Sequence, residues 1–399
     1  MDPYANEWLD FLARWLHVIA GIVWIGTSFY FVAVDNHLRP PEESEDARRG
    51  VAGEEWEIHG GGFYQVQKYR VAPPVLPEKL HWFKWEAYTT WLSGFALLIV
   101  LYYVNARSYL IDPSVADLTP AEAIAISIGL LAAAWIVYDA LCRAIPSQLV
   151  LAVSVIALTT VAAWGCSQLF SARAAYVQVG AMLGTIMVAN VFFVIIPAHW
   201  GLVRAKQAGR EPDPAPGIRA KDRSVHNNYL TLPVLFAMLS PHFPATYGHS
   251  YSWLILVVMM LIGAWIRLYF NLRHVGYNVW PIPVTAAIAI AGVAVAIRPQ
   301  GGSGGTPSGG GPAATVPFMK AQAIVEERCV PCHSSNPTRM DSAPLGIKFD
   351  TPRQIKARAD LIEQVAVEST AMPLGNATGM TTGERAVLGA WIRQGAKIK

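Results

Sequence analysis

The strongest chemical signal in the sequence is the run Cys329-Val330-Pro331-Cys332-His333. Cys-x-x-Cys-His is the attachment sequence of a c-type haem, in which both thiols bond to the porphyrin and the histidine ligates the iron. A zinc site is the main alternative, but no second Cys or His pair follows. A thioredoxin-like dithiol is the other, and its strand and helix pattern is missing. We predict one covalent haem c on Cys329, Cys332 and His333.

The sixth iron ligand should lie further along the chain. His333 is the last histidine, so methionine is left. Met340 follows His333 too closely to reach the opposite haem face easily. Met372 precedes Pro373 in a turn-rich stretch like the Met-Pro ligand loop of class I cytochromes c, and it is the predicted ligand. Met380 is the alternative ligand. If a methionine here does not bind iron, we expect it to fill space in the hydrophobic core.

Polar residues also gather where apolar runs end. Each one alone is most simply an interfacial anchor. Together they suit a planar, anionic, hydrogen-bond-rich molecule, because arginine binds oxyanions, amides pair with amide edges and aromatic rings stack on flat ones. These residues are Lys68, Arg70, Trp85, Glu86, His226, Asn227, Asn228, Arg267 and Arg273.

Two further histidines lie near the other ends of the apolar runs. His17 is inside the first run, and an intramembrane histidine is a functional candidate by default. His242 falls at a similar depth, so the pair could ligate a haem b. For His17, a hydrogen bond to a backbone carbonyl is an equally good structural interpretation. Cys142 and Cys166 are interpreted as small buried hydrophobes.

The composition predicts that a lipid bilayer positions these residues. Of 399 residues, 53% are hydrophobic and 15% are charged, against roughly 25% charged in soluble domains. The net charge of +3 is too small to indicate nucleic acid as a partner. Eight runs approach the length of about 20 residues that crosses a membrane, although the sixth is short and contains Pro233. The runs are 8–34, 86–104, 121–142, 148–170, 174–198, 228–242, 251–272 and 281–297.

The basic residues predict an orientation, because cytoplasmic connections are enriched in Lys and Arg. In the connections before the last helix, fifteen lie on one side, in 35–85, 143–147, 201–227 and 273–280, and two lie on the other, Arg107 and Arg173. No Lys or Arg precedes the first run, so we expect a retained helix and not a cleaved signal peptide. After eight crossings both termini lie outside the cytoplasm.

The predicted fold class is all-α, with an eight-helix transmembrane bundle and a small class I cytochrome c domain. The bundle covers residues 1–298. Residues 299–316 are rich in Gly, Pro and Ser and behave as a flexible tether. In 317–399 we expect helices around 318–328, 352–368 and 384–397, with Thr381 and Glu384 forming a capping box.

Long specific strings support a family resemblance over essentially the whole chain. They are HGGGFYQVQKYRVAPPVLPEKLHWFKWEAYTTWLSG, RSVHNNYLTLPVLF, CVPCHSSNPT and AMPLGNATGMT. The chain resembles the integral-membrane, cytochrome c-linked urate oxidases of bacteria. The resemblance implies oxidation of urate toward 5-hydroxyisourate, with electrons passing to a fused periplasmic haem. From there they would reach a soluble cytochrome c or a terminal oxidase, with the protein in the bacterial inner membrane.

Urate is a planar monoanion that must give up two electrons and a proton, so its site needs a cation and a proton acceptor. Glu86 and His226 are the predicted bases. Lys68, Arg70, Arg267 and Arg273 are candidates for the anion, Asn227 and Asn228 for the amide edges, and Trp85 for stacking. Two alternatives stay open: a dehydrogenase for another small polar substrate or quinol, and a membrane-anchored electron carrier without catalysis.

Overall fold

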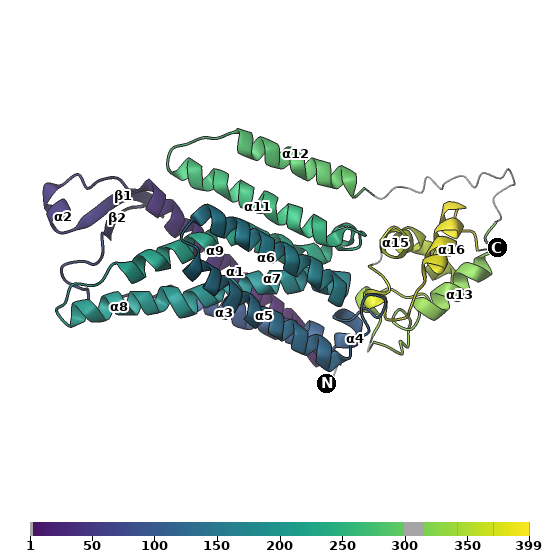
Figure 1. Cartoon of the computed structure of the whole chain (residues 1–399). Coiled ribbons are helices and arrows are strands. Elements are labelled where there is room, and N and C mark those ends of the chain that lie inside the picture. The colour runs from purple at the N-terminus through teal and green to yellow at the C-terminus, as the bar shows by residue number, and fades with distance from the viewer. Residues whose placement is uncertain (1–2, 299–314, 341, 370, 399) are drawn as a thin grey trace.

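The computed structural model describes residues 3–298, 315–340, 342–369 and 371–398. Most of these residues are helical, and the long helices run side by side in an elongated bundle (Figure 1). Turns of π-helix extend α3 (Leu98–Tyr103) and join α7 to α8 (Asn190–Ile195). The long helices are α1 (Pro3–His37), α3 (Trp85–Leu97), α5 (Pro120–Ala144), α6 (Gln148–Leu169), α7 (Ala172–Ala189), α8 (Ile196–Gln207), α9 (Ala215–Leu239), α11 (Ser252–His274) and α12 (Pro281–Ala296).

A helix occupies each of the eight predicted apolar runs. Within the described residues, five helical stretches are long and apolar enough to cross a membrane, judged by length and composition. The stretch α12 is apolar but shorter. The predicted, mostly helical fold with several apolar helices is confirmed, and crossing by all eight stays a prediction. The five stretches are Trp8–His37, Pro120–Ala144, Gln148–Leu169, Ala172–Gln207 and Ser252–His274.

Helix α9 begins well before the apolar run that predicted it. Its first half, 215–227, carries charged side chains, so an apolar pattern could not mark its start. Pro233 lies inside the helix, where it removes a backbone donor. Gly263 of α11 packs at this point, and a Cβ there would lie 3.2 Å from Leu232 Cβ. The glycine therefore lets α11 approach α9 where the proline interrupts its hydrogen bonding.

A β-hairpin interrupts the helical pattern, so the all-α prediction is wrong for this segment. Strands β1 (Val51–His59) and β2 (Gly62–Tyr69) pair antiparallel, after the short helix α2 (Ser44–Arg48). Gly60 and Gly61 form the turn with φ of +58° and +82°. Two consecutive positive φ angles favour glycine and match the right-handed twist of a hairpin.

The described residues from 315 onward, here called the C-terminal region, have their own hydrophobic core around Val325, Leu388 and Trp391. The predicted helix over 352–368 is broken into three short pieces, the last a π-helical turn, Glu363–Val367. The predicted capping box is confirmed, since Glu384 N donates to Thr381 Oγ1 at 3.2 Å and Thr381 N donates to the Glu384 carboxylate at 2.6 Å. The helices are α13 (Phe318–Arg328), α14 (Pro352–Ala357), α15 (Ala359–Ile362) and α16 (Thr382–Arg393).

The C-terminal region packs on one end of the bundle. That end carries α4 (Ala106–Tyr109), α10 (Pro244–Tyr247) and the start of α1, while the hairpin lies at the opposite end (Figure 1). Gly375 has φ +56°, and a Cβ there would lie 2.6 Å from Ile111 O and 3.0 Å from Ser108 O. A Cβ on Gly248 would likewise lie 2.6 Å from Ser369 Cβ. Two glycines thus permit a close contact between the two parts.

Candidate active site

Helix α9 carries several of the predicted polar residues but points them in two directions. Asn227 and Asn228 are consecutive, so their side chains leave the helix about 100° apart. Asn227 reaches Asn190 and Met187 beside α7, whereas Asn228 reaches Arg267 and Asn271 on α11. The structure therefore divides the predicted site into two clusters.

The first cluster, here called the His226 cluster, consists of Tyr138, Gln148, Asn190, His226 and Asn227. Gln148 Oε1 lies 3.1 Å from His226 Nε2, so Nε2 donates and Nδ1 accepts from Tyr138 Oη at 2.8 Å. Asn190 Nδ2 donates to Tyr138 Oη at 3.2 Å and to Asn227 Oδ1 at 2.8 Å. Every polar side chain in this cluster has a partner.

A buried ion pair adjoins the His226 cluster. Arg223 is 6% exposed, and its Nη2 lies 2.6 Å from Asp139 Oδ1. Its guanidinium also lies 5.0 Å from the ring centroid of Tyr138. The sequence analysis missed this pair, although Asp139 and Asn190 within apolar runs were signals for it. The pair compensates its own charge, which is typical of a structural role.

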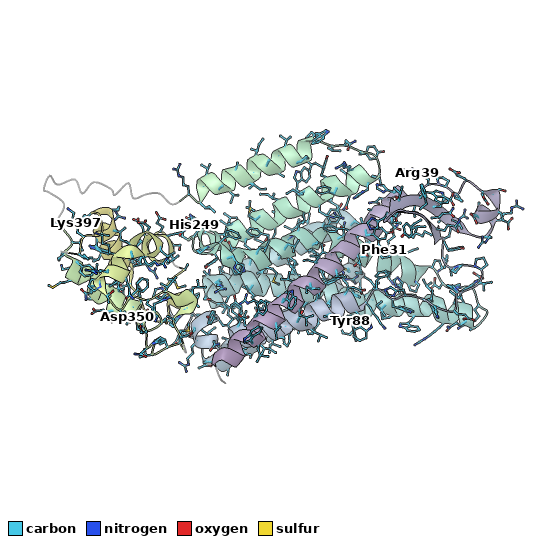
Figure 2. All side chains as sticks on the ribbon, turned by 180° about the vertical axis from the view of Figure 1, so that it is seen from behind. Phe31, Arg39, Tyr88, His249, Asp350 and Lys397 are labelled. Carbon is cyan, nitrogen blue, oxygen red and sulfur yellow. The ribbon has the colours of Figure 1, made fainter. Side chains whose placement is uncertain are left out.

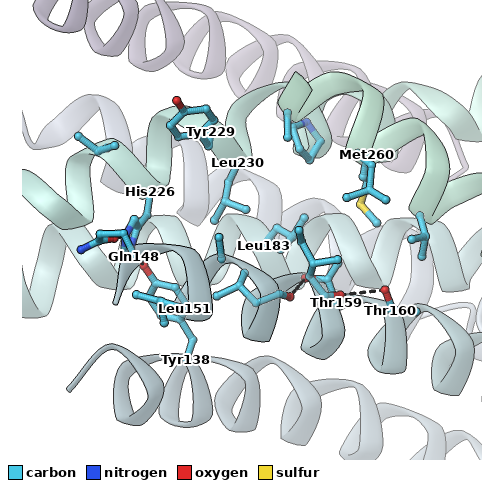
Figure 3. A pocket seen from close by; sticks show the side chains of 18 of the residues that line it. Tyr138, Gln148, Leu151, Thr159, Thr160, Leu183, His226, Tyr229, Leu230 and Met260 are labelled. Atoms are coloured by element: carbon cyan, nitrogen blue, oxygen red, sulfur yellow. Dashed lines mark hydrogen bonds between the residues drawn. The ribbon is translucent and has the colours of Figure 1, made fainter. Parts of the chain in front are cut away.

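A cavity of about 440 Å³ opens beside the His226 cluster. Figure 3 shows His226, Gln148 and Tyr138 at one end, with Leu183 and Met260 among the apolar residues of the remaining wall. Hydrocarbon walls exclude water without offering hydrogen bonds, so they suit a polar anion poorly. His226 is therefore less suited to be the urate base than the sequence predicted.

The second cluster, here called the Arg267 cluster, consists of Asn228, Arg267 and Asn271. Arg267 Nε donates to Asn228 Oδ1 at 2.5 Å, and Asn228 Nδ2 donates to Asn271 Oδ1 at 3.0 Å. The guanidinium carbon of Arg267 lies 3.7 Å from the ring centroid of Phe29. These contacts hold the guanidinium between α1, α9 and α11.

The charge of Arg267 is uncompensated. The residue is 4% exposed, its Nη2 atom is buried, and among the described residues it has neither a hydrogen-bond partner for Nη2 nor a carboxylate within salt-bridge distance. A buried donor without a partner costs about 1–3 kcal/mol or more when it is charged. A planar anion would supply the missing acceptor through a charge-assisted hydrogen bond.

Glu86 carries a second buried polar atom without a partner, Oε2. Helices α3 and α1 pack antiparallel, because His17 meets Ser93 and a Cβ on Gly21 would lie 3.9 Å from Thr90. Continuing this pairing places Glu86 within about one helical turn of the level of Phe29. Glu86 and the Arg267 guanidinium thus lie near the same level along α1.

The remaining predicted substrate residues lie apart from both clusters. Lys68 is paired with Asp35. Arg70 and Arg273 are exposed. Trp85 is 64% exposed, and its ring faces Lys84. These four residues therefore lie outside the two buried clusters, and their role in binding substrate stays a prediction.

The two histidines proposed for haem b have different surroundings. His17 Nδ1 lies 3.0 Å from Thr90 O and 3.2 Å from Ser93 Oγ, and a Cβ on Gly94 would lie 2.8 Å from the His17 ring. Its ring therefore serves the packing of α1 on α3. His242 ends the turn Ser240–His242 and is exposed. Ligation of a haem b by this pair stays an untested prediction.

The residues of the Cys-x-x-Cys-His sequence fit a c-type haem. His333 Nδ1 lies 3.1 Å from Ile347 O, which leaves Nε2 available to a metal. Burial raises the pKa of Cys329 to about 12 and also raises that of Cys332, whereas reactive dithiols have lowered thiol pKa values. Met372 is partly buried at the margin of the C-terminal core, and Met380 is 3% exposed within it. Both stay candidates for the sixth ligand.

Comparison with known proteins assigns the helical bundle to a family. Residues 3–298 match the family described as Urate oxidase N-terminal. The chain belongs to this family. No curated protein and no solved structure matched the chain. The family match covers both polar clusters and the hairpin, and it ends before the C-terminal region, so it supports urate chemistry in the bundle independently of the Cys-x-x-Cys-His sequence.

Proposed function

We propose that the protein is a membrane-bound urate oxidase that passes electrons from urate to a c-type haem in its C-terminal region. The observation that carries this proposal is Arg267, a buried guanidinium with an unpartnered Nη2 in a chain of the Urate oxidase N-terminal family. Urate is an anion with adjacent carbonyl and N–H groups. Arg267 binds the anionic edge, and the amide edge of Asn271 is positioned beside it through Asn228.

The reaction also needs a proton acceptor. The urate monoanion plus water gives the 5-hydroxyisourate monoanion, two protons and two electrons. Glu86 is the proposed acceptor, because its Oε2 is buried and has no partner among the described residues. Asn228 acts as a positioning residue, since its side chain is already engaged on both sides by Arg267 and Asn271.

Electrons must cross much of the bundle to reach the C-terminal region. Aromatic rings follow α3 in that direction: Trp91 and Phe95 are stacked with centroids 5.1 Å apart, and Tyr103 lies 6.4 Å from Phe95. The contact at Gly375 adjoins the end of this route at α4. A c-type haem, when bound by Cys329, Cys332, His333 and Met372, accepts single electrons and passes them on.

The proposal includes the predicted arrangement in the bacterial inner membrane. The eight helices cross the bilayer, the basic hairpin end faces the cytoplasm, and the C-terminal region lies in the periplasm. A soluble cytochrome c or a terminal oxidase then takes the electrons. The arrangement is supported by the position of the hairpin and of the C-terminal region at opposite ends of the bundle (Figure 1).

The proposal is tested by adding urate anaerobically to the purified, oxidised holoprotein and following haem absorbance. We expect reduction of two haems for each urate consumed, because urate releases two electrons. An addition of buffer alone is the control. An unreduced haem in a preparation with intact covalent haem would contradict the proposed function.

A quinol dehydrogenase is a second candidate function, and the cavity beside His226 favours it. The cavity is mainly apolar and carries a histidine and a tyrosine at one end, as a quinol head and its hydrocarbon tail would need. Reduction of the haem by a short-chain quinol in the same anaerobic experiment, with no reduction by urate, would favour this candidate. A mere membrane anchor is disfavoured by the orphaned Glu86 and Arg267 atoms.

A further inference from the structure

Three titratable side chains form a hydrogen-bonded chain between the Arg267 cluster and the hairpin. His274 Nδ1 lies 3.2 Å from His37 Nε2, and His37 Nδ1 lies 3.0 Å from Glu55 Oε1. The residues come from α11, α1 and β1, so they are far apart in the sequence. The atoms are linked in a line, since each nitrogen of His37 faces a different neighbour, and this differs from the convergent arrangement that metal ligands need.

The hydrogen-bonded series begins at His274, beside the Arg267 cluster. Arg267, Asn271 and His274 are spaced four and three residues apart, so they share one face of α11. His274 therefore lies one turn beyond Asn271, toward the hairpin end. A proton leaving a ligand in the Arg267 cluster meets His274 as the next titratable group along this face.

The hydrogen-bonded chain of His274, His37 and Glu55 ends at a second cavity, of about 360 Å³, beside the hairpin. Glu55 Oε2 is buried and has no hydrogen-bond partner among the described residues. His37, Glu55, Arg39, Glu42 and Glu54 line this cavity. The label at Arg39 in Figure 2 marks the same end, opposite to His249 and the C-terminal region. Glu55 thus combines one bonded oxygen with one free oxygen in a polar cavity.

We propose that His274, His37 and Glu55 conduct one of the protons released by urate oxidation to the hairpin end of the bundle. The inference rests on the proposed function, in which Glu86 takes one of the two protons released per urate and His274 receives the other. His274 takes a proton on Nε2 and gives its Nδ1 proton to His37 Nε2. His37 then gives its Nδ1 proton to Glu55, which releases it to water in the cavity, and reversal of the ring orientations resets the chain.

The charged residues around His274, His37 and Glu55 favour proton transfer from His274 toward Glu55. Arg267 and Arg273 lie on the same helix as His274, and their positive charges repel a proton there. Glu54, Glu42 and Arg39 line the cavity. The Glu54 carboxylate accepts hydrogen bonds from Gln65 Nε2 and from Glu42 N. A proton is therefore repelled at the α11 end and attracted toward the carboxylates of the hairpin.

The test is His37→Ala in the holoprotein, with His59→Ala at the exposed hairpin turn as the matched control. We expect urate-driven haem reduction to slow by about a hundredfold, the lower scale of lost proton transfer, with urate affinity unchanged. Added imidazole should restore the rate, because it can occupy the vacated space and relay protons. The control variant should match the wild type.

A second readout follows proton release in proteoliposomes with a pH-sensitive dye on one side of the membrane. Wild-type protein should release protons on the hairpin side, and Glu55→Gln should delay that release. Normal turnover in His37→Ala, or a loss that imidazole does not restore and that is accompanied by lost urate binding, would overturn the relay. Failure of urate to reduce the wild-type haem would instead overturn the proposed function.

Discussion

Two buried arginines, Arg223 of α9 and Arg267 of α11, have charges in different environments. Arg223 is held by Asp139 and by the ring of Tyr138, so its charge is balanced within the protein. Among the described residues, Arg267 contacts the neutral amide of Asn228 and the ring of Phe29, and its Nη2 has no partner. A balanced buried charge stabilises one structure, whereas an unbalanced one awaits a ligand. Arg223 therefore belongs to the scaffold, and Arg267 is the better candidate for a binding site.

The largest expected effect is on stability. Arg223→Gln should lower the free energy of unfolding by about 3–5 kcal/mol, because it leaves Asp139 buried without its partner. Arg267→Gln should leave stability unchanged or raise it, because it removes an uncompensated buried charge. Thermal unfolding of the two variants in the same detergent measures the difference. Equal destabilisation by both would remove the basis for the comparison.

The next effect concerns turnover. Glu86→Gln should lower urate-driven haem reduction by at least about a hundredfold, the usual lower scale for a lost general base, and should leave the haem spectrum intact. His226→Gln, on the balanced side of α9, should stay near the wild-type rate. Stopped-flow absorbance of the haem measures both. A larger loss in His226→Gln than in Glu86→Gln would place the reaction beside the apolar cavity.

Urate affinity gives a third test. Arg267→Gln should weaken urate binding by about ten- to a hundredfold, since a hydrogen bond to a charged group contributes about 1.5–3 kcal/mol. Arg273→Gln on the exposed surface of the same helix is the control and should bind as the wild type does. Equilibrium binding of urate to the anaerobic protein, followed by calorimetry, gives both values.

A fourth test concerns the contact between the bundle and the C-terminal region. Gly375→Ala and Gly346→Ala place the same side chain at similar φ angles, +56° and +64°, but the Gly375 Cβ would collide with Ile111 O and the Gly346 Cβ would meet nothing within 4 Å. We expect slower urate-driven haem reduction in Gly375→Ala alone, with unchanged haem spectra in both. Equal rates would show that this contact does not position the haem.

The smallest expected effect is on the acid stability of the C-terminal region. Arg328 lies 2.9 Å from Glu384, and although burial opposes it, hydrogen bonds from Thr381 and Arg328 hold the pKa of Glu384 below its usual range. A lowered folded-state pKa contributes stability above the unfolded value and loses it as the pH falls through the folded one. The C-terminal region should therefore lose stability below about pH 4, and Glu384→Gln should reduce that dependence. Acid titration by circular dichroism measures it.

The helices were largely predictable, because long apolar runs are typical of helices that can cross a membrane. Every predicted run contains a helix, and the capping box at Thr381 was correct. The hairpin was missed although Gly60 and Gly61 between residues such as Ile58 and Phe63 are a strong turn signal. The polar residues of that segment indicated binding, whereas the two glycines indicated a turn with positive φ angles.

The candidate site was predictable in residue type and not in arrangement. Asn228, Arg267 and Glu86 were singled out because polar groups at helix ends are costly in lipid. Their separation from Asn227 and His226 depends on how α9 is rotated against α7 and α11, and one sequence does not specify that rotation. Arg223 was missed because it lies before the apolar run, in the charged first half of α9.

The opposite positions of the hairpin and the C-terminal region give the proposed reaction an electrical consequence. Electrons that leave toward the periplasm while protons leave toward the cytoplasm carry net charge across about 30 Å of hydrocarbon. A membrane potential that is negative inside would favour this movement by about 2.3 kcal/mol per charge for each 100 mV. Urate oxidation would then run faster in an energised cell, and each turnover would draw on the same voltage that respiration maintains.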